Sequence, residues 1–394
     1  PFFQKSIGLL IILWISVWML EGNLKDKFNM LVKNQVFFWA LSSVFWVQLI
    51  GLFLSIDLNN GWFQIEKKLS LFIFPFIFAS VSFSKQDFIK ILNAFCYGAL
   101  IAGVLCIIRS LALYSSSGDP NLFFYKSFSY FMHPSYFGMY INTACLVLLV
   151  KIHESFSNGA SNQKKAGSIL LLCFALILII LTNSKAAILT LGIVLILYFV
   201  KILLFDKKGI AFLIFSISII IIFLSLVFFF PKPVDRISIA YESLKNKDNT
   251  KSTDDSNGTR LRLMIWEEAL DLIKEKPFLG YGTGSSKSIL TEKYKQKGMS
   301  FAEKGKYNAH NQFLQSGIEN GMFGIITLLV LILIPFFIAI KYKNFIALGI
   351  PILIGVNFLF ESMLGLQSGI IYTGFFLSLI TFALKNNPMF SSTK

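Results

Sequence analysis

Charge is scarce in this sequence. Only 14% of the 394 residues are charged, and 55% are hydrophobic, whereas about 25% of the residues in a typical soluble domain are charged. This balance excludes a soluble enzyme and a disordered chain. The four cysteines all lie in apolar stretches, where a thiol behaves as a small hydrophobic group, so a disulfide scaffold is excluded as well.

Histidine is rarer still, and this limits the chemistry that the chain can perform. His133, His153 and His310 are far apart in the sequence, and no group of His, Cys, Asp and Glu has metal-ligand spacing. We therefore expect no protein-built metal site and no cofactor. Nothing resembles a Ser-His-Asp arrangement or a phosphate-binding loop, because GYGTGSSK lacks the spacing of such a loop.

Long apolar stretches, by contrast, run almost from end to end. A helix needs about 20 apolar residues to cross a hydrocarbon core of about 30 Å. Eleven candidate spans lie at about 6–20, 36–56, 69–83, 88–113, 135–151, 167–183, 186–204, 209–230, 317–340, 345–360 and 369–384. We predict an all-α polytopic membrane protein with about 11 spans in this chain, and twelve, with both ends inside, in the natural protein.

The basic residues indicate orientation rather than nucleic-acid binding. The net charge is +15, but the Lys and Arg residues fall between the apolar spans, where they set membrane topology. One set of short loops and ends holds fifteen of them, and the other set holds six. The richer side is therefore expected to be cytoplasmic, which puts the long polar stretch 231–316 on the outer side.

This topology divides the chain into three parts: N-terminal transmembrane helices at 1–230, a large outer loop at 231–316 and C-terminal transmembrane helices at 317–394. Within the loop, residues 241–258 are polar and predict a mobile crossing segment. A helix is expected from Thr259 to about Lys276, ended by Pro277, and its apolar face comprises Ile265, Ala269, Leu272 and Ile273. A glycine-rich turn containing Gly280, Gly282 and Gly284 precedes a second helix that opens near Ser285.

Arginine is used sparingly, and only on the outer side. The four arginines are Arg109, Arg236, Arg260 and Arg262, and the last two stand at the start of the loop helix. An anion there would meet guanidinium groups, free backbone N–H groups and the positive end of the helix dipole. The alternative is a solvated basic turn on a polar loop.

Three further cationic or basic side chains lie at the outer boundary. Lys185 stands where two apolar spans meet, and it either snorkels to the headgroups or points into a polar cavity. His133 precedes Pro134 at the mouth of a span, where a structural hydrogen bond is expected. His310, beside Asn308 and Asn311, can accept a proton near neutral pH. A capping or solvated histidine is the alternative.

Two carboxylates, Glu319 and Glu361, lie in or beside apolar sequence near the same face, and Gln367 follows on a short turn. A carboxylate in such a place is costly unless a cation or polar neighbours bind it. We therefore expect each to be paired with Lys or Arg, in a role that fixes the geometry of the site.

Together these segments resemble the O-antigen ligase and polymerase superfamily. The resemblance is carried by NGTRLRLMIWEEALDLIKEKPFLGYGTGSS, in which arginines precede Trp266, by HNQFLQSGIENGMFG, and by ESMLGLQSGIIYTGFF near the C-terminus. The topology resembles the family over nearly the whole chain, and the motifs cover about 185–325 and 361–376.

The resemblance implies a fold similar to membrane-embedded GT-C type glycosyltransferases that use polyprenyl sugar donors. Family members transfer a glycan from undecaprenyl diphosphate at the periplasmic face, without a metal. Ligases attach it to the lipid A core, whereas polymerases extend another carrier-linked glycan. The expected location is the bacterial inner (cytoplasmic) membrane.

The resemblance also implies roles for individual residues. The family's re-entry histidine corresponds to His310, and its loop arginine to Arg262 or Arg260, between which spacing does not decide. A second family arginine falls at Lys185, which keeps the charge and loses the two-pronged geometry. These cations would bind the donor diphosphate, and His310 would take the acceptor proton in an inverting displacement. Supporting roles fall to Asn311, Glu319, Trp266, Gln367 and His133.

The leading hypothesis is therefore an O-antigen ligase. An O-antigen polymerase or a protein O-oligosaccharyltransferase would share every residue named above and remains the alternative. A glycolipid flippase or secondary transporter would need ionisable residues near mid-membrane, and the candidates here lie at the outer edge. The sugars of donor and acceptor and the oligomeric state are left open.

Overall fold

The computed structural model describes residues 6–205, 217 and 258–386. All regular elements within these residues are helices, which confirms the all-α fold class. The described residues fall into two compact units. One contains those of 85–237 and 343–357, and the other those of 5–84, 238–342 and 358–394. The predicted division at 230 and 316 follows topology along the chain and remains a prediction.

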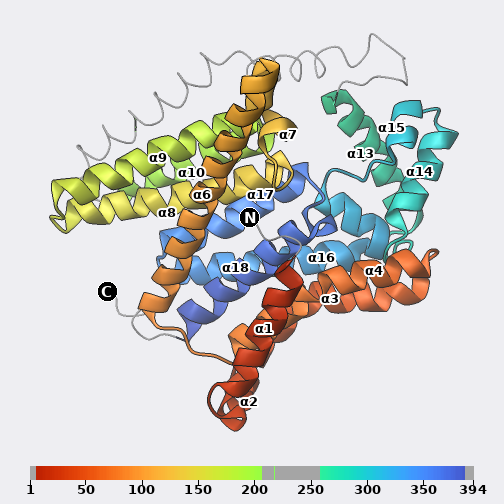
Figure 1. Ribbon diagram of the computed structural model, residues 1–394. Coiled ribbons are helices and arrows are strands. Elements are labelled where there is room, and N and C mark those ends of the chain that lie inside the picture. Colours follow the sequence, from red (N-terminus) through yellow and green to blue (C-terminus); the bar gives the residue numbers. More distant parts are fainter. Residues whose placement is uncertain (1–5, 206–216, 218–257, 387–394) are drawn as a thin grey trace. The chain divides into compact units, whose positions relative to one another are not determined.

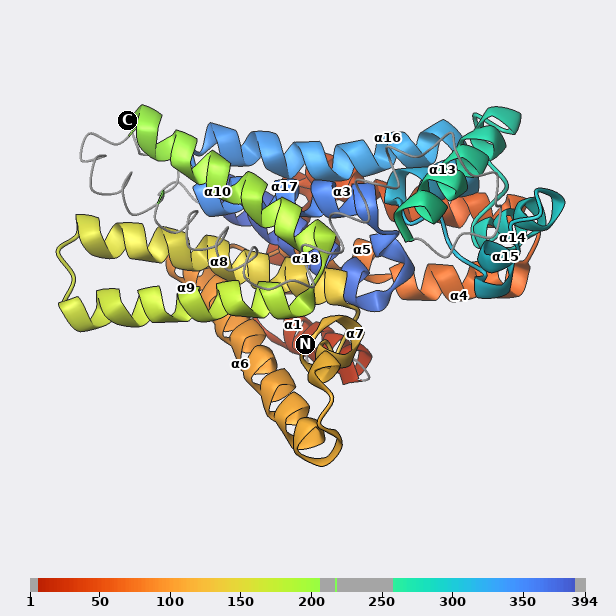
Figure 2. The same cartoon turned by 90° about the horizontal axis from the view of Figure 1, so that it is seen from above.

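The first unit is built around α8 (Pro134–Ser157). Three long helices pack on it: α6 (Lys85–Ser117), α9 (Asn162–Thr182) and α10 (Lys185–Phe205). Figures 1 and 2 show α8 and α9 side by side. The short elements η3 (Pro120–Phe123) and α7 (Tyr125–Phe128) lie between α6 and α8 along the chain, and most of α17 (Phe345–Phe360) belongs to the same unit. Small residues permit close packing, since a Cβ at Gly138 would lie 2.3 Å from the Ala187 Cβ.

The second unit contains the other helices. Its N-terminal part comprises α1 (Ile7–Leu20), α2 (Leu24–Lys33), α3 (Gln35–Gly51), η2 (Leu52–Leu54), α4 (Leu58–Lys68) and α5 (Ser70–Ala79). Its C-terminal part comprises α13 (Gly258–Glu275), α14 (Ser286–Gln296), α15 (Ser300–Gly305), α16 (Gln312–Lys341), η4 (Met363–Gly365) and α18 (Gln367–Lys385). The strongly buried α18 packs against α5 and α16, and α3 packs against both of these helices as well.

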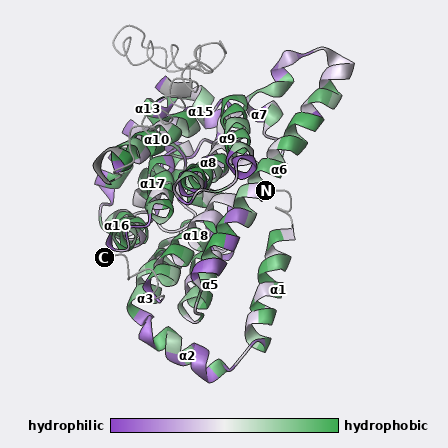
Figure 3. Cartoon of the chain, turned by 90° about the vertical axis from the view of Figure 1, so that its left-hand side faces the viewer, coloured by the Kyte–Doolittle hydropathy of each residue, from purple (hydrophilic) through white to green (hydrophobic). Residues whose placement is uncertain are grey.

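Seven described helices are long and apolar enough to cross a membrane: α3 together with η2, α6, α8, α9, α10, α16 and α18. The pair α1 and α2 makes an eighth if it counts as one span bent by 107°. Figure 3 shows this pair as an apolar α1 followed by a largely hydrophilic α2. These findings confirm a multi-pass membrane protein.

The remaining predicted spans have different outcomes. The span at 345–360 is α17, which is apolar and shorter than the others. The span at 69–83 contains α5, a helix of 10 residues with Pro75 inside it. The span at 209–230, the segment 241–257 and Arg236 lie outside the described residues, Ile217 excepted. The total of eleven therefore remains a prediction.

Residues 258–305, the described part of the predicted loop before the His310 segment, form a core of their own. The predicted helix from Thr259 is α13, and its expected apolar face is buried at Ile265, Ala269 and Leu272. Leu290 and Tyr294 of α14 and Ala302 of α15 join the same core. Figure 1 shows α13, α14 and α15 gathered together. The second predicted helix is also present, because α14 begins at Ser286 with Ser285 as its N-cap.

The glycine-rich turn attaches this loop to a break in α16. Asn320 and Gly321 have non-helical dihedral angles, which frees the preceding carbonyl groups of the helix. The N–H of Tyr281 donates to the Ile318 carbonyl and that of Gly282 to the Glu319 carbonyl, each at 2.8 Å. Gly282 has φ +93°, and a Cβ there would lie 2.4 Å from the Leu54 carbonyl carbon. The turn is therefore a packing device that tolerates only glycine at this position.

Candidate active site

The segment that carries His310 is held at both of its ends. It follows α15, where Lys306 adopts the left-handed conformation, and it ends where Asn311 caps α16 by accepting from the N–H groups of Phe313 and Leu314 at 2.9 and 3.1 Å. Between them His310 has φ +46°, which is uncommon outside glycine, and its N–H donates to the Asn308 Oδ1 at 3.0 Å. This backbone sets the direction of the imidazole.

A carboxylate joins the two residue types that the sequence singles out. The Glu361 Oε1 accepts from the Arg262 guanidinium at 2.9 Å, and its Oε2 lies 3.4 Å from the His310 Nδ1. Arg262 comes from α13, His310 from the segment before α16, and Glu361 from the turn after α17. These three residues, the Arg262–Glu361–His310 cluster, are the candidate active site.

The three side chains of the cluster differ in their exposure to solvent. The Glu361 side chain is 9% exposed, that of His310 22% and that of Arg262 32%. The carboxylate is therefore enclosed, whereas the imidazole and the guanidinium reach solvent. Glu361 has further interactions in the structure, and the ion pair with Arg262 compensates the cost of burying its charge.

The protonation pattern of His310 follows from this contact. A carboxylate at Nδ1 favours the tautomer that carries its proton on Nδ1, which leaves the Nε2 lone pair able to accept a proton. Arg262 uses one of its N–H groups on Glu361, and a guanidinium has five. The cluster thus offers a proton acceptor and a cation with unused donors.

Two aromatic side chains support the cluster: Trp266 of α13 and Tyr307 of the segment before His310. The Trp266 indole N–H donates to the Ala309 carbonyl at 2.9 Å, which ties α13 to the residue before His310. The Tyr307 ring lies beside the imidazole, with the ring centroids 5.6 Å apart. Asn311 adds a third tie, because its amide donates to the Leu359 carbonyl at 3.2 Å.

Glu319 has a different place. Its Oε2 lies 3.5 Å from the Lys68 ammonium and 3.1 Å from the Gln48 amide, and its Oε1 accepts from Ser286 at 2.7 Å and from Gln315 at 3.1 Å. These partners come from α3, α4, α14 and α16. The expected pairing of both carboxylates with cations is confirmed, and Glu319 joins four helices around a buried charge.

The other predicted residues lie as follows. His133 caps α8 by accepting from the Ser135 N–H at 3.4 Å, which confirms the expected structural bond. Lys185 is half-buried at the first position of α10, and both residues belong to the first unit. In the second unit, Arg260 is half-buried two residues before Arg262, and Gln367 is exposed at the start of α18.

No group of three or more His, Cys, Asp and Glu side chains suited to a metal ion occurs among the described residues. The functional groups of the cluster are a carboxylate, an imidazole and a guanidinium. Sequence reasoning noted Glu361 as a carboxylate that needs a cation, but it did not identify the partners. They lie 99 and 51 residues away in the chain.

Comparison with known proteins confirms the resemblance. Residues 169–329 match the family model described as O-antigen ligase. An uncharacterised protein of Haemophilus influenzae is 28% identical over 264 residues, which are 64% of this chain and 60% of that protein. A Rickettsia conorii protein with the provisional name polysaccharide ligase is 30% identical over 267 residues, 66% of this chain and 59% of that protein. The chain thus spans about three fifths of the length of these relatives.

Proposed function

Because residues 169–329 match the O-antigen ligase family, we propose that this chain is a membrane-embedded glycosyltransferase of the O-antigen ligase type. It transfers a glycan from undecaprenyl diphosphate to the lipid A core at the periplasmic face of the bacterial inner membrane. The observation that carries the proposal is the bridge by Glu361 between Arg262 and His310. A transferase of this kind needs a base for the acceptor and a cation for the leaving diphosphate.

The transfer takes place in one displacement. The acceptor hydroxyl attacks the anomeric carbon of the donor as its proton passes to the Nε2 of His310, and the bond from that carbon to the diphosphate oxygen breaks on the opposite face. The products are an inverted glycosidic bond, a protonated His310 and free undecaprenyl diphosphate. His310 then returns its proton to solvent.

Arg262 stabilises the charge that develops on the leaving diphosphate. A guanidinium binds phosphate oxygens in a fixed geometry, and its N–H groups not used by Glu361 remain available for this role. Arg260, two residues before Arg262 on α13, is the further cation assigned to the diphosphate, and the role of Lys185 stays a prediction from the resemblance. Arg262 is linked through Glu361 to the base, which supports it as a catalytic arginine.

Glu361 is a positioning residue, since it acts through the two others. It holds the His310 proton on Nδ1 and restrains the guanidinium, as the carboxylate of a Ser-His-Asp triad orients its histidine. Trp266 and Asn311 fix the segment on which His310 lies. Glu319 supports the site from α16 through its contacts with neighbouring helices.

The test is the glycolipid profile of cells in which the only copy of the protein carries His310→Ala or Arg262→Lys. A ligase predicts loss of long polymer from the lipid A core, with that polymer accumulating on the carrier. The control is Lys304→Gln, an exposed position in α15, produced at the same membrane level, and it should give the profile of the natural protein.

Two outcomes would contradict the proposal. Lipid A core capped with single repeat units would indicate an O-antigen polymerase instead. An unchanged profile of the His310→Ala cells would exclude His310 as the base and favour a transporter, because flux of a glycolipid does not require a proton acceptor at the outer face.

A further inference from the structure

A basic cavity of about 330 Å³ lies beside the catalytic cluster. Its walls come from α4, from the start of α14, from the segment 306–315 and from the turn 362–365. Three lysines line it: Lys67 of α4, Lys287 of α14 and Lys306 after α15. We call this cavity the α4 basic pocket.

The positive charge of the α4 basic pocket is not neutralised by the residues that the structure describes. Within that part of the chain none of the three lysines forms an ion pair with a carboxylate, and Lys67 donates only to the Gly365 carbonyl at 3.0 Å. The one carboxylate in the lining, Glu319, is already bound to Lys68. The pocket therefore carries an excess of positive charge, which suits an anion.

Burial adds to the demand for an anion. The pKa of Lys67 is lowered to about 8, chiefly by burial and then by the neighbouring charge of Lys68, while Glu319 raises it. A bound anion would offset both unfavourable effects. Lys67 donates to the Gly365 carbonyl and lies 4.6 Å from the centroid of the Phe63 ring, but no carboxylate of the described ranges pairs with it. A half-buried cation without an anionic partner is typical of a binding site.

The polar lining suits a sugar. Asn60, Gln64 and Asn308 line the pocket. The Asn60 amide already donates to the Gly284 carbonyl, and the Asn308 Oδ1 already accepts from the His310 N–H. An amide has two N–H donors and two acceptor lone pairs, so each of the three side chains keeps capacity for further hydrogen bonds. The Phe63 ring lies in the same wall and presents an apolar surface. A phosphate alone would need only the cations, whereas the combination of amides, an aromatic ring and lysines fits a saccharide that carries an anionic group.

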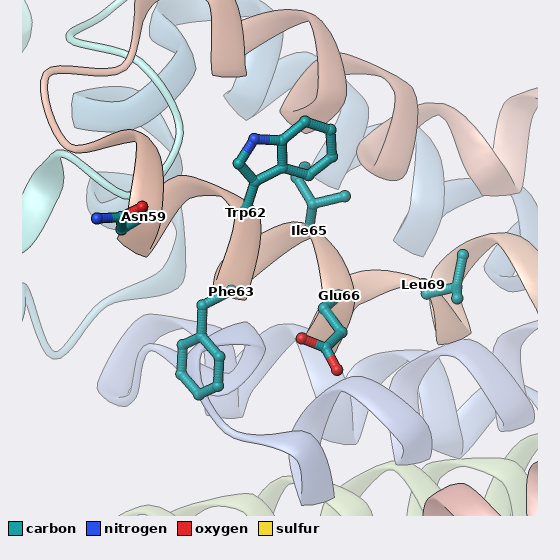
Figure 4. Close-up of a pocket in the computed structure, with 6 residues that line it drawn as sticks. All are labelled: Asn59, Trp62, Phe63, Ile65, Glu66 and Leu69. Carbon is teal, nitrogen blue, oxygen red and sulfur yellow. The ribbon is translucent and has the colours of Figure 1, made fainter.

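An apolar groove of about 470 Å³ continues from the pocket along α4. It is lined by Asn59, Trp62, Phe63, Ile65, Glu66 and Leu69, so that Phe63 belongs to both cavities. Figure 4 shows these side chains following one another along the helix, with Trp62 and Phe63 on opposite sides. Both aromatic side chains are more than half exposed, at 59% and 54%. Such a groove next to a basic pocket fits an amphiphile.

Lys306 gives a separate indication that the pocket is used. It has φ +44° at the end of α15, a position where glycine is the usual residue. Lysine is strained there, and its side chain lines the pocket. The backbone gives no reason to prefer lysine to glycine, whereas an anion in the pocket does.

We propose that the α4 basic pocket and the adjoining groove bind an anionic glycolipid, the phosphorylated saccharide in the pocket and the start of a hydrocarbon chain in the groove, which it enters at Phe63, the residue that lines both cavities. This inference rests on the proposed function, in which it assigns the acceptor's subsite. Asn308 and Ser362 line the pocket, and they lie two residues from His310 and one from Glu361. An acceptor held there is adjacent to the base.

The experiment measures binding by the purified chain in detergent. The probes are lipid A with two phosphates, lipid A without phosphate, and phosphatidylglycerol. The variant is Lys287→Gln with Lys306→Gln, and the matched control is Lys295→Gln with Lys304→Gln. The control makes the same change of charge on α14 and α15 at exposed positions outside the lining.

The proposal predicts that the variant binds phosphorylated lipid A about tenfold more weakly, which corresponds to about 1.4 kcal/mol. The control should bind it as the natural chain does, and dephosphorylated lipid A should bind weakly to all three proteins. Phosphatidylglycerol should bind equally to variant and control. An equal loss of phosphatidylglycerol in the variant would overturn the proposal, since the pocket would then be a site for ordinary membrane lipid. Unchanged binding of lipid A would also overturn it.

A second readout separates this inference from the proposed function. His310→Ala should bind phosphorylated lipid A with an unchanged Kd, and the lysine variant should show a raised KM for the acceptor with kcat preserved. If His310→Ala still transferred glycan while the lysine variant lost binding, the catalytic proposal would fail and the pocket would stand. A lowered kcat with an unchanged KM in the lysine variant would contradict the acceptor subsite.

Discussion

The contact between Glu361 and His310 makes a sharp prediction for Glu361→Gln. The substituted amide can still accept from Arg262 through its oxygen, and its NH2 group then faces the His310 Nδ1, which is 3.4 Å from the carboxylate in the natural chain. An N–H donor at that place turns Nδ1 into an acceptor and moves the ring proton to Nε2. The base would then be blocked in a structure that is otherwise intact.

The magnitude can be bounded from the geometry. A hydrogen bond to a charged group contributes about 1.5–3 kcal/mol, and the length of this one places it at the lower end, which is about tenfold in rate. General base catalysis as a whole contributes about 10²–10⁴-fold. We expect kcat to fall about tenfold to a hundredfold in Glu361→Gln, and further in His310→Ala.

The assay is single-turnover transfer by the purified chain with a lipid-linked donor. The matched control is Glu292→Gln, which makes the same chemical change at an exposed position of α14. Because Glu361 acts through His310, adding Glu361→Gln to His310→Ala should cost little more. A kcat within twofold of the natural chain, or an equal loss in the two backgrounds, would refute this account of Glu361.

Three further predictions concern stability and pH. Lys68→Ala leaves the Glu319 charge buried without its cation, so we expect a loss of about 3–5 kcal/mol in the free energy of unfolding. A melting temperature within about 2 °C of that of the natural chain would contradict this expectation. Gly282→Ala places a Cβ against the Leu54 backbone at φ +93°. We expect lower thermal stability and faster hydrogen exchange in α14. An unchanged melting temperature and unchanged hydrogen exchange in that helix would show that glycine is not required at this turn. The affinity for phosphorylated lipid A should fall as pH rises from 7 to 9, because Lys67, whose pKa is lowered to about 8, loses its charge in that range. Lys67→Arg should make the affinity less dependent on pH. An equally steep decline in that variant would exclude Lys67 as the cause.

Much of the fold could be predicted because membrane-spanning helices are recognisable in a sequence as long apolar stretches. The apolar stretches located most of the helices that the structure describes, and the period of Ile265, Ala269 and Leu272 located α13 and its buried face. The amphipathic helix α4 was not predicted, since its 11 residues lie between two apolar stretches and are too few to show a clear periodicity. It is the helix that lines both cavities beside the cluster.

The site was predictable in its residue types and not in its connections. Arg262 and His310 stood out by chemistry and motif, whereas their common partner Glu361 lies 99 and 51 residues away. The packing of α13 against α16 brings Arg262 towards His310. The turn that carries Glu361 is held at the start of α16 by the hydrogen bonds Asn311–Leu359 and Leu364–Gln312. The same limit applies to Lys67 and Lys306, which sequence places far apart and which the fold brings to one pocket.

The most direct test of the account is reconstitution of the transfer itself. The purified chain would be mixed with an undecaprenyl diphosphate-linked glycan and lipid A core, and the products separated by mass. The account predicts glycan on the lipid A core with inverted anomeric configuration, formed by the natural chain and lost by at least a hundredfold in His310→Ala. Product of equal yield from the His310→Ala chain, or none from the natural chain with active substrates, would contradict it.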